Sequence, residues 1–132
     1  MSRPNVEAVR AAYEAWSRGD FGAKLDLLDP DIVFVVRPEF PDAGTYVGLA
    51  ELGRYMRSFL EPWVRLTIHA EEIIEVGERI VAAVCQRATG EESGIPGELR
   101  YFQVWSFSGG KVVRIENVRD RAEALAVASV VE

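Results

Sequence analysis

The chain has 132 residues, of which 48% are hydrophobic and 27% are charged. This size and composition predict one globular domain with a single hydrophobic core, covering residues 1–132. Fifteen Lys and Arg residues against 21 Asp and Glu residues give a net charge of −6, which argues against nucleic acid and anionic membranes as partners.

The sequence carries no signal for membrane insertion, export or metal binding. The longest apolar run, Ile32–Val36, is far shorter than the ~20 residues that cross a bilayer, and the first residues lack the apolar stretch of a secretory signal. We therefore expect a cytoplasmic protein. The chain has one Cys and one His, Cys85 and His69, which excludes an intramolecular disulfide and the usual zinc cages. With no phosphate- or dinucleotide-binding glycine motif either, we expect no metal and no cofactor.

Two helices are expected at the start of the chain. Over Val6–Arg18, apolar residues recur at steps of three and four, which is typical of the buried stripe of an amphipathic helix. Gly19 ends this helix, and Asp20 stands where an N-cap belongs. A second, short helix is therefore expected over Phe21–Leu28, with Pro30 as its terminator.

A strand, a loop and a third helix are expected next. The run Ile32–Val36 is rich in β-branched residues and unbroken, which predicts a strand buried on both faces. The segment Arg37–Gly48 contains two Pro and two Gly residues and is expected to be a loop. Apolar residues at helical spacing then predict a helix over Leu49–Leu60, which Pro62 stops.

The second half of the chain is expected to be sheet. Four long strands are predicted, at Val64–Val76, Arg79–Thr89, Leu99–Phe107 and Lys111–Arg119. Short glycine-containing turns join most of them, so successive strands should pair antiparallel as a meander. Arg121–Ala128 is expected to close the chain as a short helix.

These elements predict an α+β fold with an internal pocket. A long antiparallel sheet must bend around the helices on one side of it, and a pocket remains where the helices do not fill the hollow. The expected architecture is a cone-shaped α+β barrel in which three N-terminal helices pack on a curved, mainly antiparallel sheet and enclose that pocket.

Strand alternation predicts which side chains face the pocket. The bulkier face of the strand over 99–107 carries Leu99, Tyr101, Gln103, Trp105 and Phe107. The opposite face, with Phe102 and Val104, is apolar enough to form an interface with a second copy of the chain.

Four segments of the chain carry a resemblance to a known family. They are Tyr13–Asp20, Leu28–Val33, Tyr46–Gly48 and Tyr101–Asp120. In order and spacing they resemble the nuclear transport factor two-like superfamily and, within it, the SnoaL-like polyketide cyclase group. The resemblance implies the fold described above, a small apolar ligand of polyketide, steroid or terpenoid type, a homodimer formed through the sheet and, for an enzyme, a cofactor-independent isomerase, cyclase or lyase.

Only some of the catalytic residues of the superfamily have counterparts in this sequence. The Tyr and two Asp residues of ketosteroid isomerase-like members correspond to Ala12, Val36 and Gln103, so that proton-transfer mechanism is not supported. The last-strand Asp of epoxide hydrolase-like members corresponds to Asn117. The Asp that SnoaL-like cyclases place after the last strand as acid and base does match, at Asp120.

Nine further residues are candidates for ligand binding. Apolar and aromatic side chains that could line the pocket or simply pack in the core are Trp16, Tyr55, Met56, Phe59, Tyr101 and Trp105. Gln103 and Asn117 are amides on apolar faces, and each needs a hydrogen bond from a ligand, a neighbouring side chain or water. Arg119 is expected on the face of Asn117, where it would bind a carboxylate or enolate oxygen, or else pair with an acidic neighbour.

Two hypotheses remain open at this point. The first is a SnoaL-like protein that binds a small apolar molecule and, as an enzyme, isomerises or cyclises it by proton transfer at Asp120. The second is a non-catalytic binding or dimerisation module whose pocket is filled by its own side chains, Trp16 and Trp105 among them.

Overall fold

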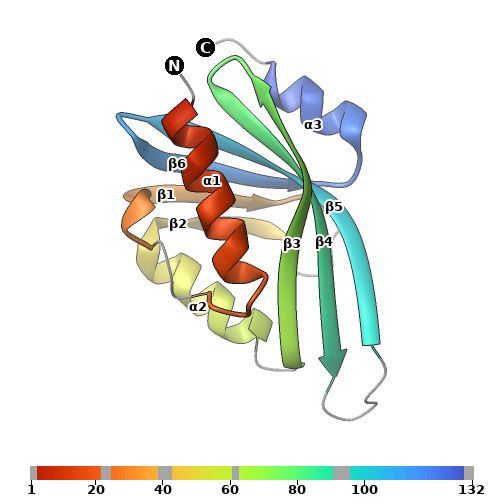
Figure 1. The fold of residues 1–132 in the computed structure, drawn as a ribbon. Helices are drawn as coiled ribbons and strands as arrows, with labels where there is room; N and C mark the ends of the chain where they lie inside the picture. The colour runs from red at the N-terminus through yellow and green to blue at the C-terminus, as the bar shows by residue number, and fades with distance from the viewer. Residues whose placement is uncertain (1–2, 22–24, 39–42, 61–62, 91–95, 130–132) are drawn as a thin grey trace.

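The computed structural model of the chain describes residues 3–21, 25–38, 43–60, 63–90 and 96–129 (Figure 1). Within these residues the elements are, in order, α1 (Arg3–Trp16), a 3₁₀ turn (Leu25–Leu27), β1 (Leu28–Val36), β2 (Gly44–Val47), α2 (Gly48–Leu60), β3 (Trp63–Val76), β4 (Arg79–Gly90), β5 (Pro96–Ser108), β6 (Lys111–Val118) and α3 (Arg121–Ala128). None of the helices in this part of the chain is long and apolar enough to cross a membrane.

The six strands of the described ranges form one mixed sheet in the order β2-β1-β6-β5-β4-β3. The last four strands pair antiparallel with their sequence neighbours, which confirms the predicted meander. β1 pairs antiparallel with β2 and parallel with β6. Because β2 and β3 form the two edges and do not pair with each other, the sheet is not closed. The α+β cone fold expected from the sequence is confirmed.

The helices cover the two faces of the sheet unequally (Figure 1). The face that packs against α1 and α2, called the inner face below, carries Trp105 and Ile115 in one hydrophobic cluster with Val9 and Tyr13 of α1. The opposite, outer face packs against α3. There Val104 belongs to a second cluster with helix residues such as Ala124 and Ala128.

Helix α3 changes the expectation for the outer face. Val104, predicted to lie in an exposed interface, is only 1% exposed because α3 of the same chain covers it. Arg37 ties the helix to the sheet through ion pairs with Glu116 of β6 at 2.5 Å and with Glu123 of α3 at 3.2 Å. This part of the outer face is therefore already occupied.

Three local expectations were wrong. The segment predicted as a second helix shows only a 3₁₀ turn at Leu25–Leu27 in its described part, since helix nucleation is costly and few residues separate Gly19 from β1. Three N-terminal helices were expected; the described residues contain two, α1 and α2, and the third α-helix, α3, is C-terminal. The predicted loop over 37–48 contains β2, whose Thr-Tyr-Val sequence pairs with β1. The strand over 32–36 was expected to be buried on both faces, but only one face is fully buried. Ile32, Phe34 and Val36 are buried, and the residues between them are half-buried.

Candidate functional site

A chain of hydrogen bonds between side chains crosses the inner face. Trp105 of β5 donates from Nε1 to the hydroxyl of Tyr13 on α1, at 2.9 Å. The Tyr13 hydroxyl donates to Oε1 of Gln103. Gln103 donates from Nε2 to Oδ1 of Asn117 on β6, at 2.9 Å. We call these four side chains the Trp105–Asn117 relay.

The direction of the relay is set at its first member. An indole N–H can only donate, so the Tyr13 hydroxyl must accept from Trp105 and turn its own proton toward Gln103. Gln103 then accepts on its oxygen and donates from its nitrogen, which leaves Asn117 accepting on Oδ1. The amide nitrogen of Asn117 is therefore the free end of the relay.

The relay lies in a largely apolar environment. Its four side chains are between 1% and 7% exposed, and they sit among the hydrophobic residues of the inner face. Burial raises the pKa of Tyr13 well above its ordinary value of 10.0, although the hydrogen bond from Trp105 acts in the opposite direction. Tyr13 therefore stays a neutral donor at physiological pH, and each bond of the relay is fixed in one orientation.

The amide nitrogen of Asn117 remains available for a further hydrogen bond. Among the described residues, Nδ2 has no hydrogen-bond partner, and it is not among the nitrogen and oxygen atoms that are both sealed from solvent and unpaired. A side chain that is 93% buried thus carries N–H groups that no described residue pairs and that are not completely sealed from solvent. Such donors suit an acceptor oxygen on a ligand.

A second polar pair lies on the same face. The Tyr101 hydroxyl of β5 donates to Oε1 of Gln86 on β4 at 3.0 Å. Gln86 is 9% exposed and Tyr101 is 5% exposed. Because Tyr101 and Gln103 are two residues apart on β5, this pair and the Trp105–Asn117 relay face the same side of the sheet.

A cluster of aromatic side chains lies where α1 meets β5 on the inner face. Trp16 stacks on Trp105 with ring centroids 5.7 Å apart, and it also stacks on Phe21. Tyr13 packs edge-on against both indoles, at 5.3 Å and 5.6 Å.

A second aromatic group lies on β1, β2 and α2. Tyr55 contacts Tyr46 at 4.6 Å and Phe34 at 5.3 Å between ring centroids. Phe34 stands opposite Ile115, and Val36 stands opposite Asn117. The free end of the relay therefore lies two positions along the β1–β6 ladder from Phe34 of this aromatic group.

The structure brings most predicted site residues to the inner face. Tyr101, Gln103, Trp105 and Asn117 are buried there, and Trp16, Tyr55 and Met56 are half-buried against the same cluster. The side chain of Phe59 lies outside the described part of the structure.

Arg119 and Asp120 stand apart from this group. Arg119 is exposed and follows the end of β6, so the strand alternation that would have placed it beside Asn117 stops at Val118. Asp120 is exposed and is the N-cap of α3, where Oδ1 accepts from the backbone N–H of Glu123 at 2.8 Å. The cap bond accounts for the position of Asp120, and its role as acid and base stays a prediction.

Two inner-face residues were missed in the sequence. Tyr13 falls within the helix expected over Val6–Arg18 but was not among the predicted site residues, although a buried Tyr hydroxyl needs a partner. Gln86 shares its strand face with Ala82 and Val84, and the alternation along β4 would have found it. Both are polar groups on otherwise apolar stripes, which is the signal that identified Gln103.

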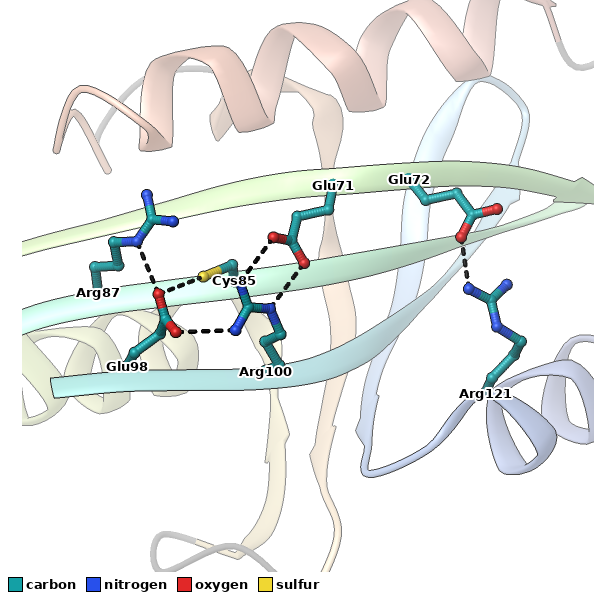
Figure 2. A network of polar contacts seen from close by, with 7 residues as sticks. All are labelled: Glu71, Glu72, Cys85, Arg87, Glu98, Arg100 and Arg121. Atoms are coloured by element: carbon teal, nitrogen blue, oxygen red, sulfur yellow. Dashed lines mark hydrogen bonds and ion pairs between the residues drawn. The ribbon is translucent and has the colours of Figure 1, made fainter.

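The outer face carries a network of ion pairs across β3, β4 and β5 (Figure 2). Arg100 pairs with Glu71 at 3.1 Å and with Glu98 at 2.9 Å, and Glu98 also pairs with Arg87 at 3.1 Å. The hydrogen bond with Arg87 lowers the pKa of Glu98, and the hydrogen bond with Arg100 lowers that of Glu71. These side chains are each about half exposed, so each pair adds little stability.

Cys85 lies buried beneath this network. Its thiol donates to Oε2 of Glu98 at 3.6 Å (Figure 2). Burial raises the pKa of the thiol, which keeps it protonated and weakly nucleophilic. In the described ranges, no group of three or more His, Cys, Asp or Glu side chains is placed to hold a metal ion.

Comparison with known proteins agrees with this architecture. A NTF2-like (nuclear transport factor two-like) protein of unknown function from Burkholderia pseudomallei is 29% identical, with a TM-score of 0.76 over 96% of this chain and 98% of that one. TerC, crystallised with polyporic acid, is 22% identical, with a TM-score of 0.75 over 96% and 99%. A candidate SnoaL-like polyketide cyclase from Jannaschia is 14% identical, with a TM-score of 0.73 over 98% and 94%. At these identities the last two show likeness of fold alone.

Sequence comparison gives the family. No curated protein is significantly similar in sequence. The model of the SnoaL-like domain matches residues 9–115, which is most of the chain. The chain therefore belongs to the SnoaL-like domain family.

Proposed function

We propose that the inner face binds a small, mostly apolar molecule through an acceptor oxygen, a carbonyl or an enol, that accepts from the amide of Asn117. The observation that carries this proposal is the free end of the Trp105–Asn117 relay. It is a 93% buried side chain with unpaired N–H groups in the part of the chain that the structure describes. The rest of the relay holds this amide in one orientation, as a preorganised donor requires.

The same arrangement would suit proton-transfer chemistry. Isomerisation and cyclisation next to a carbonyl pass through enolate-like states, and fixed N–H donors stabilise the developing negative charge. The acid and base would be Asp120, which SnoaL-like cyclases carry at the matching position after the last strand. In this chain it lies three residues beyond Asn117, at the start of α3.

Calorimetric titration with polyporic acid, the molecule crystallised with TerC, tests the binding proposal. The sharpest variant is Asn117→Asp, because it keeps the oxygen that accepts from Gln103 and removes the N–H donors. Loss of one hydrogen bond is worth about 0.5–1.5 kcal/mol, so binding should weaken about 2- to 12-fold.

Ser108→Ala, at the exposed last residue of β5, serves as control and should leave the affinity unchanged. Equal affinity in Asn117→Asp and wild type would contradict the assignment of Asn117. No heat of binding at any concentration within the solubility of the probe would contradict a ligand of this class.

A second candidate function is favoured by the aromatic packing at one end of the inner face. Trp16 of α1 stacks on Trp105 of β5, and Tyr13 packs edge-on against both, so the chain's own side chains meet between α1 and β5. On this reading the protein is a non-catalytic binding or dimerisation module. Trp16→Ala discriminates, because it would open space and improve ligand binding if the indole acts only as a plug, whereas it would weaken binding if Trp16 forms a wall of the site.

We further propose a homodimer formed through the sheet and a cytoplasmic location, both from the family resemblance. The part of the outer face that α3 leaves uncovered, over β3, β4 and β5, is the surface available for such a dimer. A mass of one chain by light scattering at micromolar concentration would exclude the dimer.

A further inference from the structure

We propose that Gln86 is a second polar anchor of the inner face, and that the protein therefore selects elongated apolar molecules with an acceptor oxygen at each end. This inference rests on the function proposed above and specifies its ligand class. It is carried by the environment of Gln86, its separation from Asn117 and the chemistry of its unpaired group.

Gln86 resembles Asn117 in every respect that made Asn117 a candidate. Its side chain is 91% buried on a face otherwise lined by Ile80, Ala82 and Val84. Its Oε1 accepts from Tyr101, so the amide nitrogen is turned away from that partner. Within the described residues Nε2 has no hydrogen-bond partner, and it too is absent from the sealed, unpaired atoms.

The strand register sets the distance between the two amides. Gln86 stands opposite Leu99 on β5, and Asn117 stands opposite Gln103 on the same strand. The two residues are thus two strands apart across the sheet and four residues apart along it. With about 4.8 Å between strands and 3.3 Å per residue, their Cα atoms lie roughly 16 Å apart on a flat sheet.

The sheet surface between the amides is apolar. Val84 of β4 and the ring of Tyr101 of β5 stand opposite each other there, between the level of Gln86 and that of Asn117, and Ala82 follows at the level of Gln103. A ligand with a single oxygen would leave one buried amide without a partner. A ligand of two or more rings with an oxygen at each end would accept a hydrogen bond from both amides. No buried donor would then be left without a partner.

Two probes that differ by one acetyl group test the inference. They are 4-acetylbiphenyl and 4,4′-diacetylbiphenyl, titrated into the full chain. In wild type the diketone should bind about 2- to 12-fold more tightly than the monoketone, as expected for one additional hydrogen bond. Gln86→Met, close to Gln in volume, should remove this preference.

A second variant covers the case in which Gln86→Met fails to fold. Gln86→Glu keeps an oxygen that accepts from Tyr101 and removes the N–H donors, so it should also abolish the preference for the diketone. Circular dichroism and a cooperative thermal transition establish that each variant is folded. Ser108→Ala is again the control and should keep the wild-type preference.

The outcomes separate the two proposals. Binding of the monoketone that depends on Asn117, with no gain for the diketone, would overturn the role of Gln86 while the proposed function stands. A diketone preference that survives in both Gln86 variants would overturn it as well. Absence of binding by both probes would contradict the proposed function and, with it, the second anchor.

Discussion

Replacing Tyr13 by Phe removes one oxygen atom from the centre of the Trp105–Asn117 relay and leaves the aromatic ring in place. The hydroxyl accepts from Trp105 and donates to Gln103, so its loss breaks two bonds at once. Trp105 is 1% exposed and Gln103 is 5% exposed, so neither can turn to water instead. The variant thus leaves one buried donor and one buried acceptor without partners.

The expected cost follows from these two orphaned groups. Each unpaired buried polar group costs about 1–3 kcal/mol, partly offset because the Tyr13 hydroxyl no longer has to be desolvated. We expect the free energy of unfolding to fall by about 2–4 kcal/mol. For a chain of 132 residues, an unfolding entropy of about 2.1 cal/mol/K per residue converts this to a fall in Tm of roughly 7–14 °C.

Urea denaturation and differential scanning calorimetry measure this change. A double-mutant cycle with Gln103→Met isolates the bond, because the second substitution should cost less when the hydroxyl is already absent. A loss below about 0.5 kcal/mol in Tyr13→Phe, or fully additive effects in the cycle, would refute the reasoning. Either result would mean that the hydroxyl is not bonded as described.

The raised pKa of Tyr13 adds a pH dependence of known sign. Above pH 10 the unfolded chain releases the Tyr13 proton while the folded chain keeps it, so the unfolded state binds fewer protons. The contribution of Tyr13 is therefore fully present below pH 10. It is lost as pH rises above 10, by up to about 1.4 kcal/mol per pH unit until the folded pKa is reached. The stability difference between wild type and Tyr13→Phe, measured from pH 9 to 11, should shrink along this slope, and a difference that stays constant would contradict it.

Three further predictions concern other parts of the fold. Asp120→Asn should keep the cap of α3 and full stability while abolishing any turnover, and turnover that survives in this variant would exclude Asp120 as acid and base. Asp120→Ala removes the cap, so the free energy of unfolding measured in urea should fall by about 1 kcal/mol. Gly48→Ala should lower the free energy of unfolding by about 1–2 kcal/mol because Gly48 has φ +86°. Gly53→Ala, in the interior of α2, should raise it by about 0.5–1 kcal/mol, and equal effects of the two substitutions on Tm would contradict the backbone conformation described here. The hydrogen bond with Arg87 and the charge of Arg100 lower the pKa of Glu98, so these pairings stabilise the fold above the ordinary pKa of 4.5 and are lost as pH falls through the lowered pKa. Glu98→Gln should therefore reduce stability slightly at pH 7 and less at pH 3, and an equal effect at both would refute the pairing.

The inner face could be predicted from the sequence because its signals are local. Alternation along one strand fixed the common face of Tyr101, Gln103 and Trp105, and it needed no knowledge of the rest of the fold. The turns at glycines predicted the meander for the same reason. Tyr13 became part of the site only through its contact with Gln103, ninety residues away in the sequence, which no local pattern contains.

Features that depend on contacts between distant parts of the chain could not be predicted from local sequence patterns. The parallel pairing of β1 with β6 joins distant segments, and β2 is a four-residue strand that exists because β1 pairs with it. Asp120 was selected from its place after the last strand, yet the orientation of its carboxylate is set by the start of α3. Burial of Val104 depends on the same helix folding back over the sheet.

The side-chain amide resonance of Asn117 gives the most direct test of the account. At 14.7 kDa the protein suits two-dimensional ¹⁵N NMR, in which the Nδ2–H signals of Asn117 and the Nε2–H signals of Gln103 are resolved from the backbone. We predict that titration with polyporic acid shifts the Asn117 signals most, with a smaller shift at Gln103. Shifts confined to the outer face around Arg100, or saturable binding with the Asn117 signals unmoved, would contradict the claim that this amide receives the ligand.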